Sequence, residues 1–281
     1  MTTIHPTAVV DRRAELGEHV SVGPLCYIGP NVVIGANTRL ISHVCILGPT
    51  KIGEHNAIWP NTVLGGDPQD VKHKGESTEL VIGDHNEFRE SVTVHRGTMT
   101  DQGTTRVGSH NLIMAYGHVA HDCVIADHVV LSNGVGLAGH IHIGSYANIG
   151  GLVGCHHFLT IGQYCFVGGM ARLVSDVPPF MIVEGNPAKV RGVNTIGLIR
   201  HGFDEQTIER LKDAYKRLFK NAAQDKGVGQ LAENLDGLER DYADDKTVAM
   251  LIDAVRNASN GIHGRYRESL RQDDPRKTIP M

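Results

Sequence analysis

Aliphatic residues recur at every sixth position along this chain, from the N-terminus to about residue 173. Two polar stretches interrupt the pattern; the phase is kept across the first and slips by one residue at the second. The in-phase positions are Ile4, Val10, Leu16, Val22, Ile28, Ile34, Leu40, Ile46, Ile52, Ile58 and Leu64, then Ile82, Phe88 and Val94, and finally Val107, Ile113, Val119, Ile125, Leu131, Leu137, Ile143, Ile149, Cys155, Ile161, Val167 and Leu173.

This period identifies the repeating unit. An amphipathic helix requires apolar residues three and four apart, and a simple strand alternates by two. A period of six instead suits very short strands joined by tight corners, where glycine follows the aliphatic position repeatedly, as at Gly17, Gly35 and Gly53. Three such strands close a coil of 18 residues, whose inward side chains stack on their copies about 4.8 Å away. The sequence therefore predicts a mainly β protein, with a parallel β-helix over residues 1–190.

Two segments break the repeat, residues 65–79 (GGDPQDVKHKGESTE) and residues 97–106 (GTMTDQGTTR). They predict loops that project from the coil. Loops carried on a rigid scaffold are where binding and catalytic residues concentrate. The alternative is that both are insertions without a role.

The repeat ends near residue 176, where two prolines predict that the chain leaves the β-helix. Helical periodicity begins after Asp204, a candidate N-cap, and returns over residues 228–239 and 244–257. We therefore expect a small α-helical C-terminal domain over residues 191–258. Residues 259–281 form a polar tail, and we expect its charges to be solvated at Arg265, Arg267, Arg271 and Arg276.

Composition excludes several classes of protein. The net charge of -4 gives no reason to expect nucleic acid as a partner. No stretch is apolar enough to span a bilayer and the N-terminus lacks the apolar core of a signal peptide, so we expect no stable membrane insertion and a cytoplasmic location. The 5 cysteines form no CxxC pair, and we expect them to be reduced.

Residues that are 18 apart should lie one above another on successive coils. This rule predicts that several polar side chains lie close together. His121, Gly139 and His157 form one column, and Asp122 and His140 form the next. The predicted patch is three coils tall and comprises His118, His121, Asp122, His140, His156 and His157.

The residues alone leave three interpretations of this patch open. A histidine can act as a general base, with a carboxylate beside it and backbone N–H groups to stabilise an oxyanion. Alternatively, the histidines bind a metal such as zinc, which requires ligands that converge on one point. The third possibility is a stack of solvated surface histidines.

Several segments also carry a resemblance to a known family. The most specific are PQD-x-K, HRGT, H-x-x-H-D-C and VN-x-x-GL-x-R. On these the chain closely resembles the acyl-ACP:UDP-N-acetylglucosamine O-acyltransferases, which start lipid A synthesis. The matching segments are IHPTAVV (4–10), GGDPQDVKHKGE (65–76), IGDHNEFRESVTVHRGT (82–98), HVAHDC (118–123), LAGH (137–140), VPPF (177–180), GNPA (185–188) and GVNTIGLIRHGF (192–203).

The resemblance implies a left-handed coil and a homotrimer whose active sites lie in the grooves between subunits. It implies direct transfer of an (R)-3-hydroxyacyl chain from acyl carrier protein to the 3-hydroxyl of UDP-N-acetylglucosamine. No covalent intermediate, no metal and no cofactor are expected, since the carrier-protein thioester is the acyl donor.

The resemblance also implies a role for each candidate residue. His121 is the general base, Asp122 orients it, and the N–H of Gly139 stabilises the oxyanion. Gly169 is the position that limits acyl length, and a glycine there predicts a long chain. The implied substrate-binding residues are Asp70, Lys72, His118, His140, His156, His157, Asn194 and Arg200.

Three residues depart from the family pattern. His157, Ile196 and His201 stand where the family commonly has Gln, Glu and Arg. All three fall on the nucleotide side, so the alternatives include the same scaffold acting on a 3-amino UDP-sugar. A CoA-dependent acyltransferase and a non-catalytic β-helix are further alternatives. The later N-acyltransferase of the same pathway carries an extra N-terminal domain, for which a repeat that begins at Ile4 leaves no room.

Overall fold

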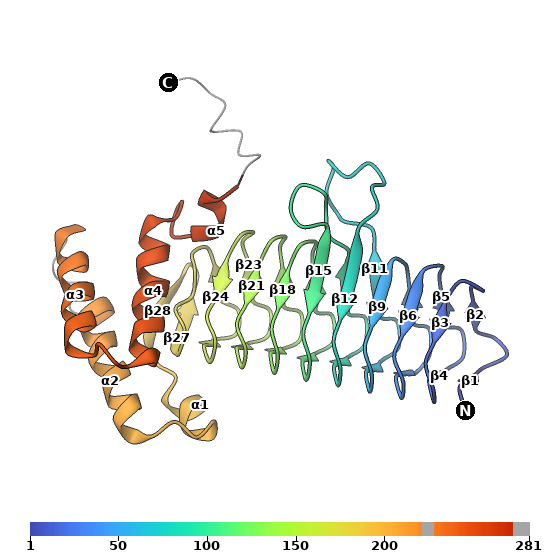
Figure 1. Cartoon of the computed structure of the whole chain (residues 1–281), viewed down its shortest axis with the longest axis horizontal. Coiled ribbons are helices and arrows are strands. Elements are labelled where there is room, and N and C mark those ends of the chain that lie inside the picture. Colours follow the sequence, from blue (N-terminus) through green and yellow to red (C-terminus); the bar gives the residue numbers. More distant parts are fainter. Residues whose placement is uncertain (221–227, 272–281) are drawn as a thin grey trace.

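The structure is a computed structural model that describes residues 1–220 and 228–271. Its larger part is an elongated three-sided coil with helices at its C-terminal end (Figure 1). Successive strands fall in rotation on three sheets, and each strand pairs in parallel with the strand one coil away. The chain therefore forms the predicted left-handed parallel β-helix, followed by a small helical part.

The three sheets, here called A, B and C, are the three sides of the coil. Sheet A contains β1 (Thr3–Ile4), β4 (Ser21–Val22), β7 (Arg39–Leu40), β10 (Ala57–Ile58), β13 (Glu87–Phe88), β16 (Leu112–Ile113), β19 (Val130–Leu131), β22 (Asn148–Ile149), β25 (Phe166–Val167), β27 (Met181–Gly185) and β28 (Ala188–Val193). Sheet B contains β2 (Val9–Val10), β5 (Tyr27–Ile28), β8 (Cys45–Ile46), β11 (Val63–Gly66), β14 (Thr93–His95), β17 (His118–Val119), β20 (Gly136–Leu137), β23 (Gly154–Cys155) and β26 (Arg172–Leu173). Sheet C contains β3 (Glu15–Leu16), β6 (Val32–Ile34), β9 (Thr50–Ile52), β12 (Glu79–Ile82), β15 (Thr104–Val107), β18 (Val124–Ile125), β21 (His142–Ile143) and β24 (Thr160–Ile161).

The aliphatic position of each repeat points into the coil. Ile28, Leu64 and Leu131 are each 0% exposed, and all belong to one continuous core. The first coil covers its residues less well, because no coil precedes it, and Ile4 is 50% exposed. Burial of each such side chain stabilises the fold by about 2 kcal/mol, so the repeat is itself the main source of stability.

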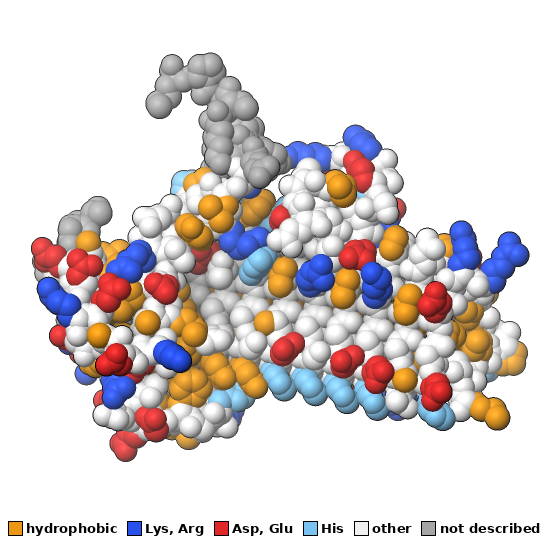
Figure 2. Space-filling view, in the orientation of Figure 1, with side chains coloured by type: hydrophobic (Ala, Val, Ile, Leu, Met, Phe, Trp, Pro, Cys, Tyr) orange, Lys and Arg blue, Asp and Glu red, His pale blue; other side chains and the backbone are white. Residues whose placement is uncertain are grey.

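The edge between sheets C and A, the C–A edge, carries a column of stacked rings. The ring centroids of successive members lie 4.6–4.8 Å apart. Every member has a φ between 53° and 61°, a backbone conformation that non-glycine residues adopt at some energetic expense. Stacking along the column offsets part of that strain. The members are His55, His85, His110, His128, Tyr146 and Tyr164, and Figure 2 shows the histidines as a row along one edge.

Both interrupting segments are loops at the edge between sheets B and C, the B–C edge, over residues 67–78 and 96–103. Ala57 pairs with Glu87, 30 residues on, which is 12 more than a coil of 18 and keeps the phase of six. Glu87 pairs with Leu112, 25 residues on, which is 7 more than 18 and shifts the phase by one. The second loop is shorter than the predicted 97–106 because its last residues already lie in β15.

The two prolines after Asp176 do not end the coil, which differs from our expectation. Val177 pairs in parallel with Ile161, and β27 then pairs in parallel with β25, so the chain completes another coil. It leaves the β-helix only after β28, which returns antiparallel to β27. Proline is tolerated here because it occupies a corner instead of a strand interior.

The C-terminal helices pack on one another around a second core that includes Leu211, Leu238 and Leu251. Asp204 caps the second helix, accepting a hydrogen bond from the N–H of Thr207, as predicted. In the described residues no helix is long and apolar enough to cross a membrane. The helices are α1 (Thr195–Arg200), α2 (Glu205–Tyr215), η1 (Lys216–Lys220), α3 (Val228–Asp241), α4 (Lys246–Asn260) and α5 (Tyr266–Ser269).

The segment after α4 is not the solvated tail that its composition predicts. Arg265 is only 6% exposed and Glu268 only 4%, and residues 262–271 lie against the B–C edge of the last coils. Arg276 lies outside the described residues. The expectation fails because a charged side chain is buried readily when a partner of opposite charge is buried with it, as Arg265 is with Glu268.

Replacing Leu131 by Ala should lower the free energy of unfolding by about 2–5 kcal/mol, because it opens a cavity in the aliphatic stack. The matched variant Ile4→Ala, at a position 50% exposed, should have a much smaller effect. Chemical denaturation followed by circular dichroism measures both. Equal losses from the two variants would contradict the conclusion that stability resides in the interior of the stack.

Candidate active site

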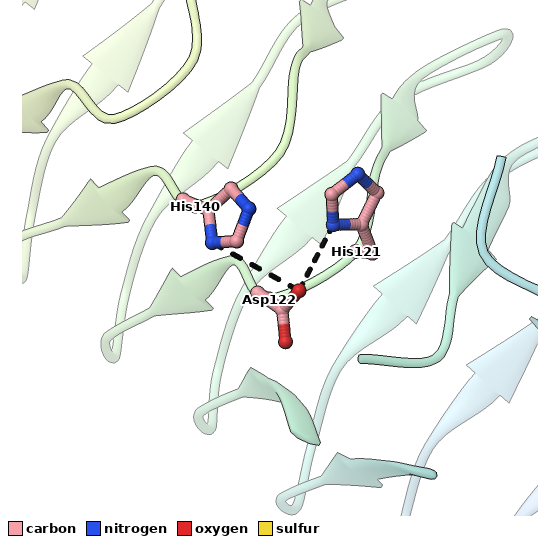
Figure 3. A group of neighbouring side chains, drawn as sticks. All are labelled: His121, Asp122 and His140. Atoms are coloured by element: carbon pink, nitrogen blue, oxygen red, sulfur yellow. Dashed lines mark hydrogen bonds and ion pairs between the residues drawn. The ribbon is translucent and has the colours of Figure 1, made fainter. Parts of the chain in front are cut away.

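His121 and Asp122 lie side by side in the turn between β17 and β18, at the B–C edge. Nδ1 of His121 lies 2.9 Å from Oδ2 of Asp122. A carboxylate only accepts hydrogen bonds, so this nitrogen carries the proton and Nε2 of His121 keeps its lone pair. Figure 3 shows the carboxyl group of Asp122 between the rings of His121 and His140. This arrangement suits His121 to accept a proton.

The second loop holds Asp122 in place. The N–H of Thr98 donates to Oδ1 of Asp122 at 2.9 Å, and its hydroxyl donates to Oδ2 at 2.6 Å. The side chain of Asp122 is 1% exposed. Several donors around a buried carboxylate fix its orientation and stabilise its charge, so the loop over residues 96–103 completes the site.

Gly139 lies one coil above His121, directly against its ring. A Cβ at this position would come within 2.5 Å of Cε1 and 2.8 Å of Nε2 of His121. Only glycine therefore lets the ring take this position. Among the hydrogen bonds of the described residues, none uses the N–H of Gly139, so that donor is available beside Nε2.

His140 stands one coil above Asp122. Its Nδ1 lies 2.9 Å from Oδ2 of Asp101 and 3.9 Å from Oδ2 of Asp122. Its ring stacks on Phe158 with a centroid separation of 4.2 Å. The hydrogen bond from His140 lowers the pKa of Asp101 below its usual range, and the charge of Arg267 adds to this effect.

The remaining histidines of the patch surround this group. His118 lies on sheet B, where its Nδ1 contacts the hydroxyl of Thr93 at 2.8 Å. His156 and His157 lie in the turn after β23, with ring centroids 4.0 Å apart. The structure thus brings together all the residues of the predicted patch: His118, His121, Asp122, His140, His156 and His157.

Burial favours the neutral form of two of these histidines. It lowers the pKa of His118, with smaller contributions from the charges of His95 and His121. It lowers the pKa of His157 to about 4, assisted by His156 and opposed by Glu268. The face of sheet B beside them is open, because a Cβ at Gly136 or Gly154 would meet nothing within 4 Å.

Among the described residues, two clusters bring potential metal ligands within 4.8 Å of one another: His121, Asp122 and His140 in one, and His156, His157 and Glu268 in the other. In the first cluster, both Nδ1 atoms already face carboxylates, and these hydrogen bonds account for the geometry. In the second, the Nε2–Oε1 distance between His157 and Glu268 is 3.9 Å, and Glu268 also pairs with Arg265.

Asp70 and Lys72 lie in the first loop, at the same edge. The side chain of Asp70 accepts a hydrogen bond from the N–H of Lys72 at 2.9 Å, which shapes the loop. The base of the loop is held by Arg96, whose guanidinium binds the carbonyl oxygens of Gly48 and Gly65 and the carboxylate of Asp67. The HRGT segment therefore links the two loops.

Asn194 and Arg200 lie elsewhere, at the C–A edge. Asn194 caps α1 and donates to the carbonyl oxygen of Tyr164 at 2.9 Å. Both residues line a cavity of about 730 Å³, together with Ile196 and His201, two of the residues that depart from the family pattern. One copy of the chain does not bring this cavity and His121 to the same edge.

Gly169 lies at the third edge, between sheets A and B. It is exposed, and a Cβ there would come no closer than 3.4 Å to the carbonyl oxygen of Gly151. Larger side chains therefore fit at this position without disturbing the coil.

Comparison with known proteins decides the family. The acyl-[acyl-carrier-protein]–UDP-N-acetylglucosamine O-acyltransferase of Stutzerimonas stutzeri is 43% identical over 263 residues, which cover 93% of this chain and 99% of that protein. The chain belongs to the UDP-N-acetylglucosamine O-acyltransferase family. Residues 176–263 match the family model of the second domain of these enzymes.

Solved structures of family members share the fold. The enzyme of Moraxella catarrhalis is 44% identical with a TM-score of 0.84, covering 90% of this chain and 96% of that one. The enzyme of Bacteroides fragilis is 36% identical with a TM-score of 0.86, covering 91% and 97%. The family membership that the motifs implied is thereby confirmed.

Three residues that sequence reasoning missed contact the candidate site. Thr98 holds Asp122, Asp101 holds His140, and Arg267 contacts the coil that carries His140. Thr98 lies within the HRGT motif, so the sequence marks it as a candidate functional residue but does not indicate its role. Asp101 and Arg267 lie outside the repeat, so the spacing of 18 residues could not predict their positions.

Stability should fall as the pH falls from about 6.5 to about 4, partly because of His157. Its pKa is about 4 in the folded chain and about 6.5 when unfolded. The unfolded chain therefore binds more protons in this window, and stability is lost as the pH falls. Replacing His157 by Gln should reduce the change in melting temperature between pH 7 and pH 4.5. An identical pH dependence in both proteins would contradict the assignment.

Proposed function

We propose that this chain transfers an (R)-3-hydroxyacyl chain from acyl carrier protein to the 3-hydroxyl of UDP-N-acetylglucosamine, the first step of lipid A synthesis. The observation that carries the proposal is the ring of His121, hydrogen-bonded to Asp122 and lying across Gly139. The names of the relatives supply the substrates, and this geometry supplies the groups that such a transfer needs.

The proposed transfer is direct. Nε2 of His121 removes the proton from the sugar hydroxyl as its oxygen attacks the thioester carbonyl. The N–H of Gly139 stabilises the oxyanion of the tetrahedral intermediate, and Asp122 stabilises the imidazolium that forms. The intermediate then expels the thiolate of the carrier protein, which takes the proton from His121. Atoms and charges balance without a covalent acyl-enzyme, a metal or a cofactor.

The substrates are held by residues from more than one edge. At the B–C edge we assign the sugar and acyl chain to Asp70 and Lys72. We assign the positioning of the substrate to His140 and His156 at this edge and to His118 on sheet B beside it. We assign the nucleotide to Asn194 and Arg200, since a guanidinium suits a diphosphate, and we place His157 on the nucleotide side. These groups occupy different edges of one coil, so we propose that a homotrimer brings them together, with the open glycine face of sheet B against a neighbour.

One observation favours a second candidate, acylation of a 3-amino UDP-sugar. Ile196 and His201 line the cavity with Asn194 and Arg200, at positions where the resemblance leads us to expect a carboxylate and a guanidinium. A CoA thioester as donor is a further alternative. We place the enzyme in the cytoplasm, since its 5 cysteines are free thiols, and we expect neither nucleic acid nor a membrane as a partner.

Replacing His121 by Ala should lower kcat about 10²- to 10⁴-fold, the contribution of a general base. The assay supplies hydroxyacyl carrier protein and, in parallel, UDP-N-acetylglucosamine or its 3-amino analogue. Gly139→Ala should also lose most activity, because its Cβ would displace the His121 ring. Gly192→Ala, where a Cβ meets nothing within 4 Å, is the matched control.

Several outcomes would overturn this proposal. They are full activity of His121→Ala, the absence of turnover by wild type with either sugar, and equal turnover with the CoA thioester. Loss of activity on chelation that is restored by zinc would favour the metal interpretation of the histidine cluster.

Replacing Gly169 by Met should shift the preferred acyl chain to a shorter one, because the side chain would project from an exposed position without distorting the coil. A series of hydroxyacyl carrier proteins of increasing length measures the shift as a ratio of kcat/KM values. An unchanged length profile would remove Gly169 from the acyl groove.

A further inference from the structure

Residues 262–271, here called the strap, return from the helices to the B–C edge. In Figure 1, α5 stands on the same side of the coil as the two loops. All but the first two residues of the strap lie beyond the residues 176–263 that match the family model. The family resemblance therefore assigns no role to most of this segment.

The last coil anchors the strap. The N–H of Tyr266 donates to Oδ2 of Asp176 at 2.9 Å, and the N–H of Asp176 donates to the carbonyl oxygen of Gly264 at 2.8 Å. The guanidinium of Arg265 donates to the carbonyl oxygen of Val174 at 2.7 Å. These contacts tie the strap to the last coil through the half-buried carboxylate of Asp176 and the buried guanidinium of Arg265, so they fix the strap with little freedom.

Two strap side chains reach the coils that carry the site. Nε of Arg267 donates to the carbonyl oxygen of His140 at 3.4 Å. Arg267, Asp101 and His140 line one cavity, where the positive charge of Arg267 attracts the carboxylate of Asp101. The guanidinium of Arg271 lies 4.9 Å from the ring centroid of Phe158. Because the ring of His140 covers one face of Phe158, Arg271 covers the other. The strap and the second loop thus enclose His140 from two sides.

The ring of His140 has two possible acceptors for its Nδ1 proton. Oδ2 of Asp101 is 2.9 Å away, and Oδ2 of Asp122 is 3.9 Å away. The second oxygen already accepts from His121 at 2.9 Å. If Asp101 moved aside, His140 would turn towards Asp122 and compete with His121 for the same oxygen.

Resting on the proposed function, we propose that Arg267 is a positioning residue of the site. It holds the backbone at His140 and keeps the carboxylate of Asp101 beside the His140 ring. The ring is then held away from Asp122, which stays available to His121. The strap thereby sets the geometry in which the sugar hydroxyl meets its base.

The test compares the effect of Arg267→Ala on the kinetic constants in the wild-type enzyme and in the His140→Ala variant. In the wild-type background, kcat/KM for the UDP-sugar should fall about tenfold, the effect of losing one charge-assisted hydrogen bond. The KM for the acyl carrier protein and the melting temperature should stay unchanged. In the His140→Ala background, Arg267→Ala should cause no further loss, because its effect passes through His140.

The matched control is Arg256→Ala, which removes an arginine paired with Glu239 on the surface of the helices and should leave both kinetic constants unchanged. If Arg267→Ala does not fold, Asp101→Ala tests the same hydrogen bond from the loop side and should show the same dependence on His140. Arg267→Lys, which keeps the charge, should retain part of the activity.

An undiminished kcat/KM in Arg267→Ala would overturn the inference, and so would an equal loss in both backgrounds. Crystal structures of wild type and Arg267→Ala give a readout that needs no turnover. The hydrogen bond between Asp101 and His140 should be lost in the variant, and its persistence would also refute the role. A wild type that is inactive on both sugars would instead refute the proposed function.

Discussion

The in-register stacking of identical coils is the constraint on which the whole structure depends. Each inward aliphatic side chain packs on its copy in the next coil, so any insertion must leave the strands aligned. The first loop adds residues in a multiple of six and the second does not, yet both leave the pairing of flanking strands intact. Insertions are therefore confined to the edges, where the chain turns between sheets.

The same stacking builds the site. A turn at the B–C edge places His121 and Asp122, and the next coil places Gly139 and His140 directly above them. The scaffold is rigid because the strands around the site pair with neighbours on both sides, and the loops add hydrogen bonds that a coil cannot supply. Thr98 orients Asp122 and Asp101 orients His140. The coils thus set the positions of the site residues, and the loops set the orientations of their side chains.

A three-sided coil also imposes a separation. Side chains on different edges face away from one another, so His121, the cavity beside Asn194 and the exposed Gly169 do not share a surface within one copy. The homotrimer that we propose would bring all three together between copies, with the open glycine face of sheet B available as a contact surface. The strap reaches only the B–C edge, where Tyr266 is anchored on Asp176 and Arg267 contacts the backbone of His140.

The sequence by itself determined the coil, the edges at which it is interrupted and the column of His121, Gly139 and His157, because a strict period converts sequence distance into position. It also determined the family, through motifs such as HRGT and H-x-x-H-D-C. Only the tertiary structure decided that the coil continues through Val177 and the prolines, that Thr98 and Asp101 reach the site, and that Arg265 and Glu268 of the strap are buried. Loops and termini follow no period, and their contacts depend on hydrogen bonds and charge pairs between residues as far apart as His140 and Arg267.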